Sequence, residues 1–447
     1  MKNKLILLFS LALSFSIYSQ ENNQSFSLEE AINFALENNR SVKNAVRGIE
    51  AAEKQKWETT ATGLPQINGG IDYQNWLKQQ VSLLPAEITG GDPGTFVPVT
   101  FSPKQSANAT ATLNQLLFDG SYIVGLQSAK VYLEISEIAK TKTDLEVRQA
   151  VINAYGNVLL TEENLLIVNK NIEVLQKNLN ETTKIYENGL AEEESVEQLQ
   201  ITLTSLENYQ NNVTRLKELA YKMFNITLGI DLNENTLLTD NLETLTLQNI
   251  SLELLEADEN IDNSIDYQIA KNQEVSKELL LKLEKSTFLP SLSAFVNAGY
   301  SGFGEKFEFT TSNQEWYGSS LLGVSMSIPI FSSGMRSAAT QRAKIDLEIA
   351  QEELTETEQQ LKFQIANAKS NYRFAIEEYE NKRQNLNLAE RIEQKNETKF
   401  FEGIASSFDL RQAQGQLYTA QQEYLQSMFD VIAKKAELET ILNTVNF

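Results

Sequence analysis

Few kinds of side chain in this sequence are able to do chemistry. The 447 residues include no histidine and no cysteine, but 60 acidic and 38 basic residues, which give a net charge of −22. Histidine-based catalysis, histidine-ligated metals and disulfides are therefore excluded. The negative charge argues against nucleic acid or anionic lipid as a ligand. Carboxylates and lysines remain. The acidic residues show no converging pair of the kind that a glycosidase needs, and no cofactor motif is present.

The acidic side chains of most interest lie beside two glycines in matching stretches. YENGLAEEESVEQLQ (186–200) and FFEGIASSFDLRQAQ (400–414) align without a gap, which pairs Gly189 with Gly403 at an offset of 214 residues. The pair SAKVYLEIS and RAKIDLEIA, beginning at Ser128 and Arg342, has the same offset. Two matches at one spacing indicate an internal duplication. The acidic residues concerned are Glu192, Glu193, Glu194 and Asp409.

The distribution of proline predicts the helices that position these residues. All seven prolines fall within 65–103 and 290–329, so 104–289 and 330–447 are free of a residue that costs a helix interior about 3 kcal/mol. We predict two long helices, each roughly 100 Å in length, that end at Gly189 and Gly403 as C-cap glycines. Shorter helices are expected over about 41–63, 190–228, 266–288 and 404–442.

An apolar seam with heptad spacing predicts coiled-coil packing of both long helices. In the second copy Lys382 interrupts the seam. The first seam comprises Val147, Val151, Ala154, Val158, Thr161, Leu165, Val168, Ile172, Leu175 and Leu179, and the second comprises Leu361, Ile365, Ala368, Tyr372, Ala375, Tyr379 and Leu386.

The two proline windows have a period of two residues, which predicts four strands within 66–117 and 291–330. In SLLGVSMSIPI (320–330), apolar side chains alternate with glycine and serine, and in NATATLNQ (108–115) polar side chains alternate with alanine and leucine. One apolar face and one small polar face are typical of a membrane barrel with lipid outside and water inside. A soluble patch of two hairpins explains the strands equally well. Aromatic residues flank the loops 77–104 and 303–315, where an interfacial belt is expected: Trp76, Phe101, Phe303, Trp316 and Tyr317.

The N-terminus has the pattern of a secretory signal peptide over residues 1–20. Two lysines precede a short apolar run, which is followed by small and polar residues. A membrane anchor is the alternative. After this segment we expect repeat one over about 27–230, a connecting equatorial segment over about 231–264 and repeat two over about 265–447. The layout predicts an exported protein without a membrane-spanning helix.

The sequence resembles the outer-membrane efflux protein family, the TolC-like ducts, over residues 27–447. The resemblance is carried by SLEEAINFALENN (27–39), the Leu-Pro pairs before the strands, LFDG and IFSSG after them, and the aromatic-x-x-Gly tips. It implies a mostly α fold with a β-barrel part: coiled-coil hairpins form a periplasmic tunnel, and four strands per chain join a twelve-stranded outer-membrane barrel. It also implies a homotrimer that works as a passive exit duct, without cofactor, together with a periplasmic adaptor and an inner-membrane pump. Drug efflux and type I protein secretion both remain open.

Strand counting constrains the assembly separately from the resemblance. Four strands cannot close a barrel, and open sheet edges are not tolerated in lipid. Eight strands would have an interior filled by side chains, whereas twelve leave room for a pore. The strand count alone does not distinguish three copies from four.

The resemblance also implies roles for the tip residues. Aligned by its glycine, Asp409 matches the first of two acidic positions that ring the tunnel entrance, and Gln412 occupies the second. Ala405 and Ser195 stand where the family has an arginine and the acidic residue that together lock the tip. Glu192–Glu194 could supply the negative charge instead. The alternative is that this triplet is ordinary first-turn acid, which is favourable at a helix N-terminus.

A soluble periplasmic coiled-coil scaffold or adaptor is the competing function. It accounts for the heptads and the signal peptide. It does not account for proline and glycine being concentrated in two windows at matching points of a duplication.

Overall fold

The structure is a computed structural model that describes residues 24–256 and 260–444, so the expected signal peptide lies outside the described residues. The chain divides into two compact units. The helical unit comprises the chain up to Gly48, Ser136–Ala270 and the chain from Leu354, and the sheet unit comprises Ile49–Ile135 and Lys271–Glu353. Each unit is described by itself.

The sheet unit is built on four antiparallel strands in the order β2-β5-β7-β8. Their bounds are Gln66–Asn75 (β2), Gln105–Phe118 (β5), Ser291–Gly304 (β7) and Trp316–Ser327 (β8). A bulge between Leu116 and Phe118 interrupts the register of β5 beside β7. Because β2 and β8 are the outer strands, each presents one row of backbone groups without a partner in this sheet.

The register places the alternating residues on two chemically different faces. One row runs Ile71–Ala109–Tyr300–Gly318, and the next runs Gly70–Thr110–Gly299–Ser319. The first face, here termed the apolar face, carries Ile67, Ile71, Tyr73, Ala107, Ala109, Ala111, Leu113, Leu292, Ala294, Val296, Ala298, Tyr300, Trp316, Leu322, Val324 and Met326. The opposite polar face carries Gln66, Asn68, Asp72, Gln74, Ser106, Asn108, Thr110, Thr112, Asn114, Ser291, Ser293, Asn297, Ser301, Ser319, Ser325 and Ser327. The predicted alternation is confirmed.

Between β2 and β5 the chain forms a second hairpin where the sequence predicted only a loop. Strand β3 (Ser82–Pro85) pairs antiparallel with β4 (Phe96–Val99), and a 3-10 turn, Ala86–Thr89, follows β3. Pro85 and Pro98 lie within these strands, although proline cannot donate to a ladder. A two-stranded ribbon tolerates both, since its outer edges have no partner strand.

Short helices adjoin the helical end of the sheet, which is the end at Gln66 and Ser291. They are α3 (Arg40–Ala61) before β2 and α8 (Ile265–Ser286) before β7. The first turn of α4 (Gly120–Glu187) lies against both of them. The Tyr122 hydroxyl donates to the Thr60 carbonyl at 3.0 Å, and the hydroxyls of Ser121 and Ser286 lie 3.1 Å apart. These contacts hold the ends of the three helices together beside the sheet.

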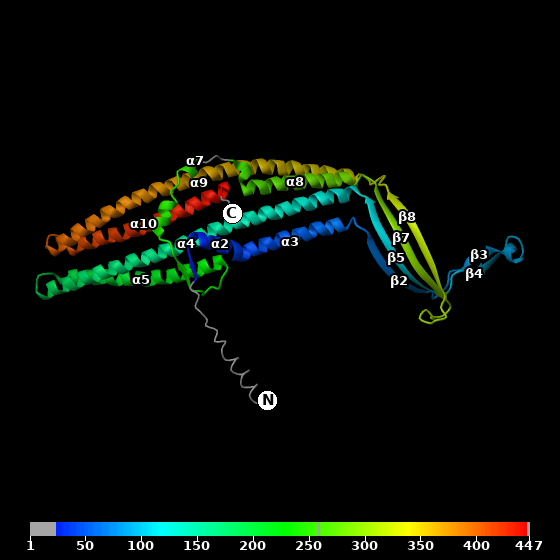
Figure 1. Ribbon diagram of the computed structural model, residues 1–447, viewed down its shortest axis with the longest axis horizontal. Helices are drawn as coiled ribbons and strands as arrows, with labels where there is room; N and C mark the ends of the chain where they lie inside the picture. Colours follow the sequence, from blue (N-terminus) through cyan, green and yellow to red (C-terminus); the bar gives the residue numbers. More distant parts are fainter. Residues whose placement is uncertain (1–23, 257–259, 445–447) are drawn as a thin grey trace, which may run out of the picture. The chain divides into compact units, whose positions relative to one another are not determined.

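The helical unit contains two long antiparallel hairpins (Figure 1). Helix α4 is followed by α5 (Glu193–Leu228), and α9 (Met335–Phe401) is followed by α10 (Ser407–Leu442). Both predicted seams are buried at their centres, with Val151, Val158, Ile365 and Tyr372 at most 1% exposed. Lys382, which interrupts the second seam, pairs with Glu423 of α10 at 3.1 Å. The mostly helical fold with two tandem hairpin repeats is confirmed.

The connecting segment and the N-terminal residues pack on the hairpins. Strand β1 (Gln24–Phe26) pairs in parallel with β6 (Thr236–Leu238). Helix α2 (Leu28–Asn38) follows β1 in the chain. Helices α6 (Leu242–Gln248) and α7 (Glu253–Glu256) and the 3-10 turn Ile261–Asn263 follow β6. Two buried tyrosines hold this layer. The Tyr155 hydroxyl donates to Asp240 at 2.8 Å, and the Tyr372 hydroxyl donates to the Asn249 carbonyl at 2.6 Å. The segment therefore wraps both hairpins.

Candidate functional site

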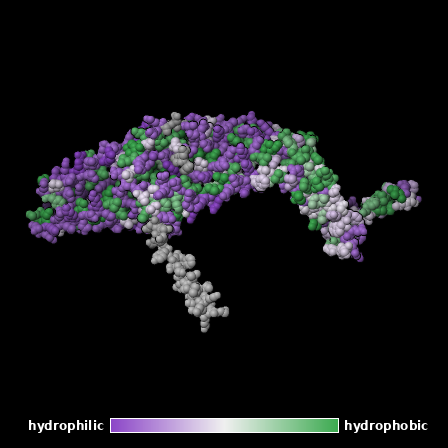
Figure 2. All heavy atoms as spheres, in the orientation of Figure 1, coloured by the Kyte–Doolittle hydropathy of each residue, from purple (hydrophilic) through white to green (hydrophobic). Residues whose placement is uncertain are grey.

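The apolar face of the four-stranded sheet is exposed in the single chain. Ile71, Leu322 and Val324 are 86%, 74% and 66% exposed, and Figure 2 shows apolar residues gathered over the strands while the helices are mostly hydrophilic. A contiguous apolar surface of this kind marks an interaction site or a membrane-facing surface. The arrangement suits lipid, because the apolar residues cover every strand and not one local patch.

The polar face carries the groups that would contact water. One hydrogen bond of this face joins two strands, since the Asn297 amide donates to the Thr112 hydroxyl at 2.7 Å. Phe295 is an exception, since it lies over Gly323, where an added Cβ would be only 2.4 Å from the ring. Uncharged amides and hydroxyls dominate this face. It therefore offers a polar and mostly uncharged surface.

Aromatic side chains cover the apolar face at its outer end, which is the end at Asn75 and Gly304. Phe307 and Phe309, from the β7–β8 connection, lie 5.5 and 5.8 Å from Tyr73 of β2, and Phe309 lies 6.2 Å from Trp316 of β8. Gly302 of β7 leaves room for this packing, since an added Cβ there would lie 3.3 Å from the Phe309 ring. Aromatic rings at this level are typical of a membrane–water interface.

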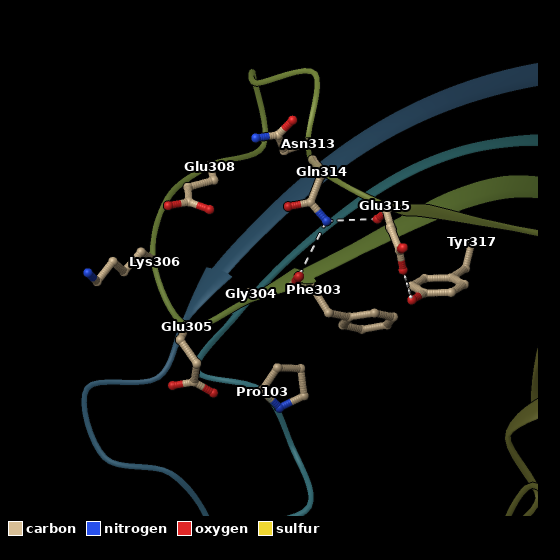
Figure 3. Close-up of a pocket in the computed structure, with 10 residues that line it drawn as sticks. All are labelled: Pro103, Phe303, Gly304, Glu305, Lys306, Glu308, Asn313, Gln314, Glu315 and Tyr317. Atoms are coloured by element: carbon tan, nitrogen blue, oxygen red, sulfur yellow. Dashed lines mark hydrogen bonds between the residues drawn. The ribbon is translucent and has the colours of Figure 1, made fainter.

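A cavity of about 770 Å³ lies at the same end of the sheet (Figure 3). Phe303 and Tyr317, whose ring centres are 6.2 Å apart, contribute one wall. The β7–β8 connection contributes Glu305, Lys306, Glu308 and Glu315. The Tyr317 hydroxyl donates to Glu315 at 2.7 Å. The lining of this cavity therefore carries a net negative charge.

The two hairpin tips have the same backbone geometry. Gly189 and Gly403 both have φ near +74°, the left-handed region that favours glycine. In the first tip Leu190 N donates to Ile185 O at 3.0 Å, and in the second Ile404 N donates to Lys399 O at 2.8 Å. These are the bonds of a Schellman C-cap, so each glycine ends its long helix as predicted.

Replacing Gly403 by alanine is expected to destabilise the second tip by about 1–2 kcal/mol, the penalty for a left-handed L-residue. Nothing lies within 4 Å of the position of an added Cβ, so the cost is one of backbone conformation and not of packing. Hydrogen exchange of the amides around 399–410 measures it. Gly415→Ala is the matched control, because Gly415 is helical and equally open. Equal protection in both variants would contradict the cap.

Asp409 occupies the first turn of α10 and is exposed. It forms a capping box with Ser406, whose hydroxyl donates to the carboxylate at 2.6 Å while Asp409 N donates back at 3.2 Å. The hydrogen bonds from the Ser406 side chain and backbone hold the pKa of Asp409 below its usual range. The carboxylate therefore stabilises the helix start and stays charged in mild acid.

The other predicted tip residues are also exposed. Glu192 is the N-cap residue of α5, Glu193 and Glu194 follow it, and Gln412 lies one turn beyond Asp409. Glu194 accepts a hydrogen bond from Gln198 at 2.8 Å. Both tips lie at the same end of the helical unit (Figure 1), so the acidic residues of the two hairpins share that end.

A polar layer inside the hairpins was not predicted from the sequence. The Asn178 amide of α4 donates to Glu397 of α9 at 2.8 Å, and Asn178 and Gln414 of α10 are each 1% exposed. Burial and the charge of Glu397 together raise the pKa of Glu393. Burial also raises the pKa of Tyr418, and both carboxylates add to that rise. The signal available in the sequence was a glutamine in an otherwise apolar helix face.

The raised pKa of Glu393 predicts a pH effect of definite sign. The folded state favours the protonated form of Glu393. Its contribution to the free energy of unfolding is therefore complete below the unfolded carboxyl pKa of about 4.3, and it is lost as pH rises through the raised pKa of the folded state. Glu393→Gln should flatten this loss. Thermal unfolding from pH 4 to 8, compared with the exposed control Glu390→Gln, measures it. The same pH slope in both variants would contradict the assignment.

The described residues contain no group of three or more carboxylates placed to hold a metal ion. Within residues 24–256 and 260–444, no helix is both long and apolar enough to cross a membrane.

Solved structures of outer-membrane channels share this fold. VceC from Vibrio cholerae is 16% identical with a TM-score of 0.72, and the match covers 93% of this chain and 95% of VceC. CusC is 17% identical with a TM-score of 0.73, and the match covers 93% of this chain and 91% of that one. For the MtrE channel of Neisseria gonorrhoeae the identity is 16%, the TM-score 0.70 and the coverage 93% and 88%. Comparison with curated proteins gives no significant match.

The amino-acid sequence also matches a protein-family model. The model described as Outer membrane efflux protein matches residues 31–221 and 263–444, which are the two hairpin repeats. The two matched ranges lie on either side of the connecting segment. The chain therefore belongs to the outer membrane efflux protein family.

Proposed function

We propose that three copies of this chain form the outer-membrane exit duct of a tripartite export system. The observation that carries the proposal is the four-stranded sheet with one apolar and one polar face and two free edges. Lipid can cover the apolar face, but it cannot satisfy the backbone groups of β2 and β8. Pairing β8 of one copy with β2 of the next removes every edge. Three copies then give twelve strands with the polar faces around a pore.

The helical hairpins extend the duct on the other side of the membrane. Chain order supports this, because all four strands connect to helices at the same end of the sheet. In a trimer the six hairpins would surround one axis and form a periplasmic tunnel. Its entrance lies at the tips of Gly189 and Gly403, where an adaptor protein and an inner-membrane pump deliver the substrate.

The duct is passive in this proposal. Its polar face offers amides and hydroxyls rather than a binding site for one substrate, and the pump supplies the energy. Outer-membrane lipid is the remaining partner, and no cofactor or enzymatic step is required. Drug efflux and protein secretion differ only in the pump and the substrate. A neighbouring gene for a proton-driven pump favours efflux, and one for an ATP-binding transporter favours secretion.

Conductance and location together test the proposal. The purified protein should be extracted from the outer-membrane fraction only with detergent, and it should conduct ions when added to a planar bilayer. Deleting the gene should increase sensitivity to dyes, bile salts or antibiotics if the duct serves efflux. A protein that is released by osmotic shock without detergent and shows no conductance would support the periplasmic scaffold instead.

A further inference from the structure

The hairpin β3–β4, taken with its two arms as residues 77–104, has no role in the duct described so far. It continues directly from the β2–β5 pair, since Trp76 N donates to Lys104 O at 2.9 Å. Its apolar side chains are exposed: Leu77 is 96%, Leu83 65%, Phe96 61% and Phe101 69% exposed. Figure 2 shows this projecting ribbon as largely hydrophobic. A two-stranded hairpin of this kind is marginal by itself, and its exposed edges invite pairing with another chain.

The position of the hairpin indicates which chain covers it. It leaves the sheet from β2, which is an edge strand. In the proposed trimer β2 lies antiparallel to β8 of the next copy, so the end of β2 meets the beginning of that β8. Leu77 and Lys78 therefore emerge beside the next copy's β7–β8 connection. This contact continues the seam between copies beyond the last strand pair.

The charges of the two segments are complementary. Lys78 is exposed at the root of the hairpin, and among the described residues no carboxylate lies within 4 Å of its Nζ. The acidic residues of the hairpin, Glu87 and Asp92, lie at its far end. The β7–β8 connection has three carboxylates and one lysine around its cavity (Figure 3). Glu315 is the carboxylate immediately before β8, where the root of the neighbouring hairpin arrives.

Apolar surfaces are also available on both sides of this contact. Leu77 is almost fully exposed, while Trp316 and Tyr317 at the beginning of β8 are 40% and 56% exposed. Burying an apolar side chain against such rings is favourable by about 25 cal/mol per Å². An apolar contact and a charged contact are thus both available, and a second copy of this chain would supply the partner for each.

We propose that the hairpin 77–104 is a clasp between copies, in which Leu77 packs on the outer end of the next copy's β8 and Lys78 pairs with Glu315 there. The proposal rests on the threefold assembly proposed above. In this role the hairpin would stabilise the trimer at the cell surface.

Disulfide cross-linking tests the geometry, because the chain contains no cysteine. Within one chain β2 and β8 are three strand spacings apart, roughly 14 Å. Leu77 and Glu315 adjoin the ends of these two strands, and a disulfide needs Cα atoms within about 7 Å, so we expect Leu77→Cys with Glu315→Cys to bond between copies. Mild oxidation of this double variant in outer membranes should convert most of the protein to covalent dimers and trimers on a non-reducing gel. Each single variant should remain monomeric after heating in detergent.

A charge exchange tests the ion pair. Lys78→Glu alone and Glu315→Lys alone should each lower the temperature at which the trimer dissociates in SDS by several degrees. The double exchange should restore most of the loss. Tyr317→Phe is the control, because it removes the hydrogen bond to Glu315 without changing the charge. Additive losses in the double exchange would overturn the pairing.

The outcomes separate this inference from the proposed function. The particle mass of the parent protein in detergent reports the trimer itself, and a mass other than three chains would overturn the assembly. A trimer without cross-links from the double variant would overturn the clasp alone. Cross-links from Leu77→Cys by itself would also overturn it, because they would place the hairpins against one another and not at the seam.

Discussion

Arginine at Val324 is expected to prevent accumulation of the proposed trimer in the outer membrane, whereas arginine at the neighbouring Ser325 is expected to leave that assembly intact. Val324 lies on the apolar face and Ser325 on the polar face of β8. A lipid-facing arginine costs about 2–4 kcal/mol at mid-membrane depth. Three copies raise this to roughly 6–12 kcal/mol, which is comparable to the whole stability of a typical domain.

Heat-modifiable migration of the outer-membrane fraction on a gel measures this difference. Met326→Arg and Ser327→Arg repeat the comparison one residue pair further along, with the same expected contrast. Ser325→Arg should assemble normally and change the conductance, because it adds a charge to the pore surface. Equal losses of trimer from both faces would show that lipid does not contact the apolar face.

Removal of the tip carboxylates is expected to reduce the cation selectivity of the channel. Threefold symmetry would place three copies of Asp409 around one axis, and a ring of like charges focuses potential and favours counter-ions. Glu192, Glu193 and Glu194 share the same end of the helical unit and add to this potential. Asp409→Asn combined with glutamine at the three glutamates should therefore shift the reversal potential under a salt gradient furthest toward zero.

The capping role of Asp409 requires its own control. Ser406→Ala removes the hydroxyl of the capping box, at a typical cost of about 1 kcal/mol, but retains the carboxylate. If the charge controls selectivity, Ser406→Ala keeps the parent reversal potential and Asp409→Asn changes it. If the cap alone matters, the two variants behave alike. A combined variant as selective as the parent would show that the entrance lies elsewhere.

Features set by local physics were predictable. The absence of proline from 104–289 and 330–447 indicated where α4 and α9 lie. The left-handed conformation of Gly189 and Gly403 follows from their position at the ends of these helices. The alternation in 320–330 determines its two faces because successive strand residues point to opposite sides. The exposure of Glu192–Glu194 and Asp409 at first turns also follows from their position after the glycines. The hairpin β3–β4 was missed because each of its strands has only 4 residues and one of them is a proline, Pro85 or Pro98.

By itself, then, the sequence determined the repeat, the long helices, the two faces of the sheet and the negative charge of the tips, since each depends on residues close together in the chain. The tertiary structure alone decided which distant groups meet. Asn178 contacts Glu397 across 219 positions, and Glu393 is half-buried only because α9 packs with its neighbours. Likewise Tyr73 meets Phe307 only because the β7–β8 connection folds over the sheet. Such contacts depend on the rotation of each helix and the path of each loop, which side-chain packing sets and no local pattern records.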